Sequence, residues 1–186
     1  MTMRGGKPNS IYLTFDDGPH PHVTPLLLDL LKAKNVKATF FLVGTNVEAH
    51  PEIVSQIAAN GHSIGNHSYD HKNFHALPLQ TQLEQIRNTN NLIEKITGIK
   101  CTLFRAPGGR LSFALFLRLI KLRITSVHWS RDSRDCHQSY EQTISSLTKT
   151  PIRNRDIVLL HDDHQKVVGI TEYILNAHQS SSFEKI

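Results

Sequence analysis

Short runs of apolar, β-branched and aromatic residues alternate with longer amphipathic stretches along this chain. Runs of this kind, bounded by Gly, Pro, Asn or Asp, are typical of strands. They predict strands at residues 11–15, 38–43, 62–66, 102–105, 124–129, 157–161 and 183–186. Between them, apolar residues at helical spacing predict helices at about 24–35, 51–60, 78–98, 112–122, 140–147 and 167–178.

Capping residues mark several of the predicted helix ends. Thr24 precedes Pro25, so Thr24 is expected as an N-cap and Pro25 as the first helical residue. Ser112 is expected to cap the apolar helix that follows it. Gly61 and Gly98 are expected to end two helices, because glycine tolerates the left-handed conformation common there.

The alternation predicts an α/β fold with about seven parallel strands joined by helical crossovers. Periodicity alone does not choose between an open doubly wound sheet and a (β/α) barrel. The chain contains no low-complexity segment, long linker or internal repeat, so residues 1–186 are expected to form a single domain. Polar clusters follow the C-terminal ends of five predicted strands. Both architectures gather catalytic groups at that edge, so these clusters are expected to meet.

The composition is that of an ordinary globular protein. Hydrophobic residues make up 39% of the chain and charged residues 20%, which argues against disorder. The longest apolar runs are far too short to cross a bilayer, so no membrane span is expected. Residues 1–10 are polar and contain no apolar signal-peptide segment. The compartment stays open: cytoplasmic for the chain as given, secreted or cell-envelope if a leader was removed.

Charge and cysteine content narrow the classes of partner. The formal net charge is +5, but Lys and Arg are scattered with little aromatic interleaving, so nucleic acid is not an expected partner. Cys101 and Cys136 have neither the number nor the spacing of a disulfide framework or a cysteine zinc site, and are expected to be unpaired thiols. Histidine stands out, with twelve in the chain and several beside aspartates.

Asp16 and Asp17 end the first predicted strand, in the segment Thr-Phe-Asp-Asp-Gly-Pro. Two adjacent carboxylates repel each other unless a cation or a proton-transfer role separates their charge states. The pair is therefore a candidate for metal binding and base catalysis. A solvated Asx turn before Gly18 is the alternative for this segment taken alone.

His67 and His71 follow the third predicted strand. Histidines at i and i+4 point the same way on a helical turn, which suits two imidazole ligands on one ion. Two histidines and one carboxylate leave coordination positions free for water and substrate, as a catalytic zinc site requires. Structural or surface histidines are the alternative for this pair taken alone.

Arg105 leaves a predicted apolar strand and enters the turn Pro107-Gly108-Gly109. Burying its guanidinium requires a carboxylate partner, and the two glycines let backbone N–H groups approach a ligand. A plain turn with a surface arginine is the alternative.

Two further segments carry candidate residues. The segment 132–136 follows the only tryptophan and, taken alone, is a charged loop containing Asp135. The apolar strand 157–161 ends in His161, a positioned acid or base. The remaining histidines near these segments are expected at the surface or rim of a site: His20, His22, His75 and His164.

Together these segments resemble the five ordered motifs of the polysaccharide deacetylases, the NodB-homology domains of carbohydrate esterase family 4. The resemblance runs from about residue 11 to the C-terminus. It lies in the segments TFDDGP, HSYDH, RAPGG, DSRDC and LLHD, which contain Asp16, Asp17, His67, His71, Arg105, Asp135 and His161.

The resemblance implies a distorted (β/α) barrel and a role for each motif. Asp17, His67 and His71 would ligate a divalent metal, usually zinc and in some members cobalt or nickel. Asp16 would be the general base, with Arg105 as its charge partner.

The last motifs would supply the acid and the substrate contacts. His161 would be the general acid, oriented by Asp135, and Leu159 would line the pocket for the acetyl methyl group. A backbone N–H of the turn 107–109 would stabilise the tetrahedral oxyanion, which makes Pro107, Gly108 and Gly109 substrate-binding residues. A bound metal would supply Lewis acidity for the acetamide carbonyl, Asp16 would deprotonate the attacking water and His161 would protonate the leaving amine.

Two positions depart from the family pattern. Gly108 stands where the family usually has an aromatic residue, and Cys136 where it prefers tryptophan. Both changes remove apolar surface near the substrate, so they bear on specificity, while the ionisable positions are intact.

The expected protein is a monomeric, metal-dependent N-deacetylase of chitin oligomers, peptidoglycan or a related polymer of N-acetylglucosamine. One alternative is an amide hydrolase of another acylated amino sugar or small molecule. A second is a non-catalytic carbohydrate-binding relative, although such a protein has little need of Asp16 and His161.

Overall fold

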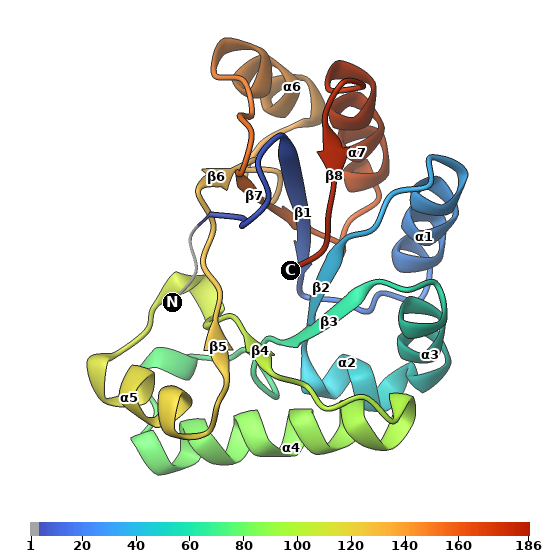
Figure 1. Ribbon diagram of the computed structural model, residues 1–186. Coiled ribbons are helices and arrows are strands. Elements are labelled where there is room, and N and C mark those ends of the chain that lie inside the picture. The colour runs from blue at the N-terminus through green and yellow to red at the C-terminus, as the bar shows by residue number, and fades with distance from the viewer. Residues whose placement is uncertain (1–3) are drawn as a thin grey trace.

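The computed structural model describes residues 4–186, and its strands form one parallel sheet that curls around an interior (Figure 1). The sheet order is β5-β4-β3-β2-β1-β7-β6, with β8 paired to the start of β1. The strands are β1 (Ser10–Asp16), β2 (Thr39–Leu42), β3 (Ser63–Asn66), β4 (Leu103–Phe104), β5 (Thr125–Ser126), β6 (Arg131–Asp132), β7 (Ile157–His161) and β8 (Ser182–Phe183). The expected distorted barrel of about seven parallel strands is therefore confirmed.

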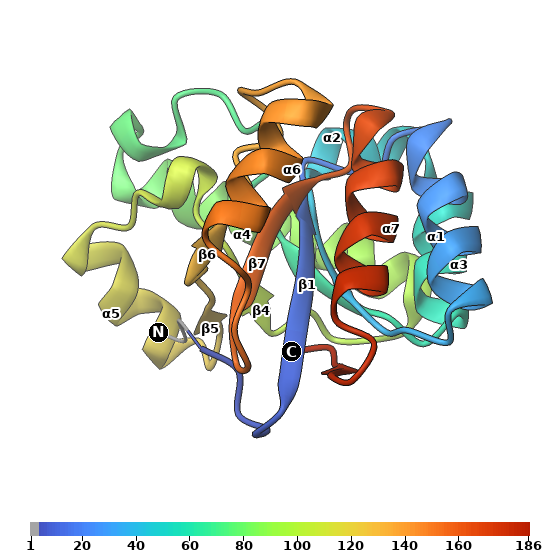
Figure 2. The same cartoon turned by 90° about the horizontal axis from the view of Figure 1, so that it is seen from above.

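Helices cover the outside of the curled sheet (Figure 1). Three of them, α1, α3 and α7, form a row on one side of β1 (Figure 2). The helices are α1 (Val23–Ala33), α2 (Gly44–Ala49), α3 (Pro51–Ala59), α4 (Leu79–Thr97), α5 (Phe113–Lys121), α6 (Tyr140–Lys149) and α7 (Lys166–Ala177). Two single 3₁₀ turns are η1 (Phe74–Ala76) and η2 (Pro107–Gly109).

Side chains of β1 point alternately to the two faces of the sheet, and this separates the apolar core from the site. In β1, Ile11, Leu13 and Phe15 belong to the main apolar cluster, which the helices α1, α3 and α7 also supply. The intervening residues Tyr12, Thr14 and Asp16 point to the other face, because successive side chains of a strand alternate. Tyr12 packs there in a separate small cluster. The interior of the curled sheet therefore begins apolar and becomes polar toward the C-terminal end of β1.

Several predicted helix ends are confirmed. Ser112 caps α5 by accepting a hydrogen bond from the Leu115 N–H, and Gly98 ends α4 in the left-handed conformation. Thr24 is not an N-cap, because α1 begins at Val23. Its hydroxyl instead donates a hydrogen bond to Asp162 Oδ2 at 2.6 Å. The side chain therefore makes a tertiary contact in place of a helix cap.

Two further local features differ from what the sequence predicted. The segment that holds His67 and His71 is irregular, with positive φ at Ser68 (67°) and His71 (62°), so it is not a helical turn. Helix α2 was missed because its sequence Gly-Thr-Asn-Val-Glu-Ala has one apolar branched residue and a glycine at its start.

Within residues 4–186, no helix is both long and apolar enough to span a membrane. The assignment of residues 1–186 to a single domain stays a prediction.

Candidate active site

The five polar motifs meet at the C-terminal edge of the sheet. Asp16 is the last residue of β1 and His161 the last of β7, and these two residues are paired in the parallel register. His67 follows β3 directly and Arg105 follows β4 directly. Asp135 lies three residues after the end of β6. The sheet therefore brings together the residues that the sequence placed at separate strand ends.

Asp17, His67 and His71 form a compact group of potential ligands. Asp17 Oδ1 lies 3.5 Å from His67 Nε2 and 3.4 Å from His71 Nε2. This oxygen is buried and accepts no hydrogen bond from any described residue. A buried carboxylate oxygen without a donor is expensive, and a cation bound between these three atoms would satisfy it.

His67 is held in an orientation that suits a ligand. Its Nδ1 lies 2.9 Å from the backbone oxygen of Arg105, so Nδ1–H donates and the lone pair of Nε2 faces Asp17. Burial lowers the pKa of His67, although Asp16 and Asp17 oppose the shift. The ring is therefore neutral at physiological pH, as metal binding requires.

The unpredicted helix α2 supports both ligand loops. Asn46 of α2 donates its side-chain N–H to the backbone oxygen of Asp17 at 2.7 Å. The first two N–H groups of the helix, from Gly44 and Thr45, donate to the backbone oxygens of Ser68 and Tyr69. Helix α2 therefore fixes the Asp17 loop and the 67–71 loop relative to each other.

Arg105 is buried and anchors Asp16. Its Nη1 donates to Asp16 Oδ1 at 2.7 Å and to Thr14 Oγ1 at 2.8 Å. Arg105 is only 1% exposed. Its guanidinium lies 4.1 Å from the centroid of the Phe41 ring and makes a cation–π contact with it. One oxygen of Asp16 is thus fixed by Arg105, while Oδ2 faces the ligand group, 3.6 Å from His67 Nε2.

Asp135 and His161 form a hydrogen-bonded pair on the other side of the site. Oδ1 of Asp135 lies 2.9 Å from His161 Nδ1 and accepts from the Ser133 hydroxyl at 2.8 Å. Oδ2 accepts from the backbone N–H of His161 at 2.8 Å. Burial opposes ionisation of Asp135, but its hydrogen bonds to His161 and His164 hold its pKa below the usual range.

The same pair sets the charge of His161. Burial disfavours the protonated ring, but the hydrogen bond and charge of Asp135, with Asp16 and Asp17 further away, raise the pKa of His161 to about 9. The ring is therefore protonated at neutral pH, and its Nε2 is free to act as a proton donor.

The turn after Arg105 has two glycines in the left-handed region. Gly109 (φ 68°) donates its N–H to Ala106, and an added Cβ would lie 2.7 Å from the Trp129 ring. Gly108 (φ 60°) has open space where a Cβ would stand, and its N–H has no partner among residues 4–186. Because Pro107 lacks an N–H, Gly108 carries the free donor of this turn.

Leu159, which is predicted to line a methyl pocket, lies on β7. It precedes His161 by two residues on the inner face of β7, is 5% exposed, and pairs with Thr14 of β1.

Two contacts of the site were not predicted. His164, expected at the rim, lies with its Nε2 3.2 Å from Oδ2 of Asp135. Thr14 accepts a hydrogen bond from Arg105. The period-2 pattern of β1 places Thr14 on the same face as Asp16 and could have indicated it. His164 lies in an irregular loop, where no periodicity gives the direction of a side chain.

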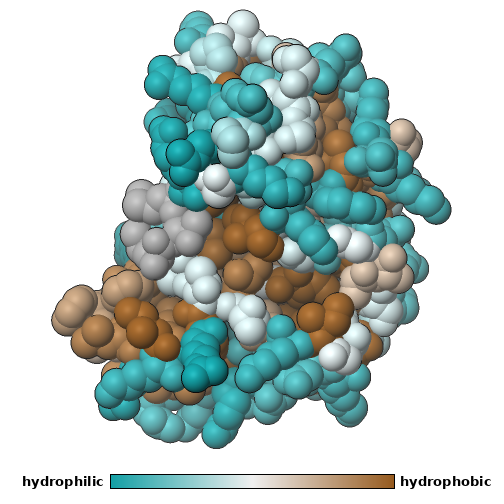
Figure 3. Space-filling view, viewed as in Figure 1, coloured by the Kyte–Doolittle hydropathy of each residue, from teal (hydrophilic) through white to brown (hydrophobic). Residues whose placement is uncertain are grey.

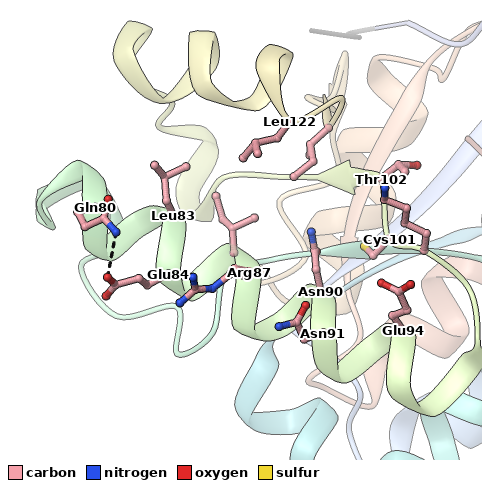
Figure 4. Close-up of a pocket in the computed structure, with 13 residues that line it drawn as sticks. Gln80, Leu83, Glu84, Arg87, Asn90, Asn91, Glu94, Cys101, Thr102 and Leu122 are labelled. Carbon is pink, nitrogen blue, oxygen red and sulfur yellow. Dashed lines mark hydrogen bonds between the residues drawn. The ribbon is translucent and has the colours of Figure 1, made fainter.

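A separate cavity of about 410 Å³ lies between α4 and the edge of the sheet formed by β4 and β5 (Figure 4). None of the site residues above lines it. Its walls come from α4 and from the segments 100–102 and 122–124.

The family model described as polysaccharide deacetylase matches residues 4–127. The chain belongs to the polysaccharide deacetylase family. This confirms the family that the motifs indicated.

Relatives and solved structures agree. A chitooligosaccharide deacetylase of Azorhizobium caulinodans is 36% identical over 155 residues, covering 83% of this chain and 74% of that protein. A peptidoglycan-N-acetylglucosamine deacetylase of Bacillus cereus is 38% identical over 136 residues, covering 73% of this chain and 50% of that protein.

The crystal structure of the Bc1960 peptidoglycan N-acetylglucosamine deacetylase superimposes with a TM-score of 0.92 at 30% identity, covering 100% of this chain and 90% of that one. These relatives are hydrolases of carbon–nitrogen amide bonds. Deacetylases of this family are metalloenzymes, and Asp17, His67 and His71 form a candidate ligand group for a metal.

Proposed function

We propose that this chain is a divalent-metal-dependent N-deacetylase that hydrolyses the acetamide of N-acetylglucosamine units in an oligo- or polysaccharide. One observation carries the proposal. Asp16 and His161, a carboxylate and a protonated imidazole, end adjacent strands in register beside the ligand group of Asp17, His67 and His71. A base, an acid and a Lewis-acid site at one edge match the needs of amide hydrolysis.

Asp17, His67 and His71 fit a metal by their chemistry. A carboxylate oxygen without a donor and two imidazole nitrogens make up a common catalytic zinc set, with zinc as first choice and cobalt or nickel as alternatives. A divalent cation bound there supplies Lewis acidity, which polarises a carbonyl and lowers the pKa of water.

Asp16 is the general base in this proposal. Arg105 holds its Oδ1, so Oδ2 is the oxygen that can take a proton from an attacking water. The buried guanidinium compensates the carboxylate charge and fixes its direction. The N–H of Gly108 then donates to the substrate oxygen as its negative charge develops.

His161 is the general acid. An amine leaves only when protonated, and the pKa of about 9 keeps a proton on His161 at neutral pH. Asp135 orients the ring through Nδ1, which directs Nε2 toward the reacting bond. The products are acetate and a glucosamine unit.

The substrate class follows from relatives named for chitooligosaccharides and peptidoglycan. Leu159 provides a small apolar surface suited to an acetyl methyl group. Gly108 and the exposed Cys136 contribute no aromatic side chain to the site, so binding to several sugar units is expected to be weak. The complete base and acid set argues against a non-catalytic relative, because binding alone needs neither group.

The test is acetate release. Purified protein supplied with Zn²⁺ or Co²⁺ should release acetate from chitotetraose or a peptidoglycan fragment, and a chelator should abolish the release. A panel of acetylated and formylated amino sugars separates this activity from that of a different amide hydrolase. Full activity in a His67→Ala, His71→Ala double variant would falsify the metal assignment.

A further inference from the structure

Helix α5 presents apolar side chains to solvent as well as to the core. Leu115 and Leu119 are buried, as expected for an amphipathic helix. Phe113, Leu117 and Ile120 are 75%, 43% and 54% exposed, and their i, i+4, i+7 spacing places them on one outward stripe. Burial in this protein does not explain that stripe, because its side chains lie outside the core.

The stripe is part of a visible patch with unpaired cations beside it. Apolar surface gathers over α5 at the lower left of the molecule (Figure 3). Arg118 and Lys121 lie on one flank of the helix and Arg123 just beyond its end, all exposed and without an ion pair among the described residues. From residue 95 to residue 131 the sequence has eight Lys or Arg and no Asp or Glu.

The cavity between α4 and the sheet edge lies next to this surface, because Leu122 at the end of α5 lines it. Its other walls carry two acidic and two basic side chains, Glu84, Glu94, Arg87 and Lys100 (Figure 4). These charges balance, so the region that combines apolar surface with an excess of cations is α5 itself.

We propose that α5 docks this protein on an anionic lipid surface. The stripe of Phe113, Leu117 and Ile120 enters the headgroup region, and the flanking cations contact lipid phosphates. A second copy of the chain fits less well, because a two-fold contact would place the same unpaired cations opposite each other. Sugar polymers alone would leave the aliphatic stripe in water. This inference goes beyond the proposed deacetylase activity.

Vesicle binding tests it. The protein should co-sediment with vesicles of phosphatidylglycerol and phosphatidylcholine in equal parts, bind pure phosphatidylcholine weakly, and dissociate as salt rises. A Leu117→Gln, Ile120→Gln variant should bind more than about tenfold less. An Arg118→Gln, Lys121→Gln variant should lose about fivefold per charge. Leu26→Gln on α1, at a position 46% exposed, is the matched control and should bind normally.

Circular dichroism and thermal melting establish that each variant is folded. Equal binding to both vesicle types, or unchanged binding in the Leu117 and Ile120 variant, overturns the proposal. So does a concentration-dependent dimer that the same variant abolishes, since a second copy would then cover α5.

An independent observation concerns His164. Its Nε2 lies 3.2 Å from Oδ2 of Asp135, whose Oδ1 lies 2.9 Å from Nδ1 of His161. Two imidazoles thus contact the two oxygens of one carboxylate that is 0% exposed. His164 lies in the loop before α7, so it approaches Asp135 from a different element than His161 does.

We infer that His164 is a positioning residue that acts on His161 through Asp135. A second imidazole 3.2 Å from Oδ2 restricts the plane of the carboxylate and takes up part of its negative charge when its N–H faces that oxygen. Less of that charge then stabilises the protonated ring of His161. The other titratable groups nearby include Asp163, 3.9 Å from His164, and Asp162 in the same loop. Cys136 lies beside Asp135 and His161, and Asp16 and Asp17 lie on the side of β1. This inference rests on the proposed function of His161 as the acid.

The test compares His164→Ala with His164→Gln, which keeps an N–H donor. In the Ala variant kcat should fall about tenfold with KM little changed, and the alkaline limb of the kcat profile should move to higher pH. In the Gln variant the alkaline limb should return to the pH at which it lies in the wild type. His178→Ala at the far end of α7 is the control for loss of a histidine.

An alkaline limb at the same pH in wild type and His164→Ala overturns the inference. Absence of acetate release by the wild type would instead count against the proposed function. In that case NMR titration still tests the role of His164, because it measures the pKa of His161 in wild type and in His164→Ala without any need for catalysis. An identical titration in both proteins refutes the role of His164.

Discussion

The two sides of the site differ in how their carboxylates are satisfied. On the side of β1 and β3, the buried Oδ1 of Asp17 has no donor and faces two imidazole nitrogens at 3.4 and 3.5 Å. On the side of β6 and β7, both oxygens of Asp135 have hydrogen-bond partners within the protein. A cation would satisfy the free oxygen on the first side, whereas protein groups satisfy both oxygens on the second side.

The contrast separates two kinds of preorganisation. Backbone and side-chain donors hold the acid in place before any ligand arrives. In the proposed function a metal bound to Asp17, His67 and His71 would stabilise that side, which would couple metal binding to local order there. Changes on one side should therefore leave the other side measurably intact.

The largest effect is expected from Asp16→Asn, which removes the base and keeps the shape. We expect kcat to fall by about 10³-fold or more, with the metal content unchanged because Asp16 is outside the ligand group. Acetate release and metal analysis measure the two quantities. Asp29→Asn, an exposed aspartate on α1, serves as the control. Activity close to wild type would remove Asp16 as base.

Metal binding should distinguish the two sides next. Zn²⁺ at about 100 times its Kd should stabilise the wild type by ~2.7 kcal/mol, seen as a rise in Tm. His67→Ala should lose that rise and most of the activity. Asp135→Asn should keep the rise, because its side of the site does not contact the ligands. A metal-dependent Tm in His67→Ala that matches the wild type would contradict the assignment.

The acid should show its own pH dependence. Because the pKa of His161 is raised from 6.5 to about 9, the stability it contributes is fully present below about pH 6.5 and is lost as pH rises through about 9. The alkaline limb of kcat should fall in the same range. Asp135→Asn should move that limb to lower pH and reduce kcat by about 10²-fold. A limb that stays near pH 9 in the variant would show that Asp135 does not set it.

The smallest effect is expected at the wall of the site. Gly108→Tyr would add aromatic surface in space that is open, and should lower KM for chitotetraose a few-fold. Its φ of 60° is unfavourable for a side chain, which should cost about 1 kcal/mol of stability. Urea unfolding measures the second quantity. A higher KM would mean that an open wall suits the substrate of this protein.

Sequence alone predicted the elements whose patterns are strong. The alternation in β1 and the apolar run of β7 gave both strands, and their polar ends gave Asp16 and His161. The site residues could be placed together because parallel strands share one C-terminal edge.

The rest depended on tertiary contacts. Helix α2 has little apolar periodicity, and its place is set by hydrogen bonds to the loops of Asp17 and His67. His67 and His71 meet through two residues with positive φ, Ser68 and His71, which the i, i+4 argument could not foresee. The contact of His164 with Asp135 joins two irregular loops, where a single sequence gives no register.

The pairing of Asp16 with His161 across β1 and β7 has an evolutionary consequence. Neighbouring strands are held about 4.8 Å apart by their backbone hydrogen bonds, whatever the side chains are. The separation of the two strand ends is therefore inherited from the sheet rather than from any loop. Loops such as those of Gly108 and Cys136 can accumulate substitutions, insertions or new specificities without changing that separation. The loops can thus change the substrate that is bound, while the sheet keeps the spacing that the reaction needs.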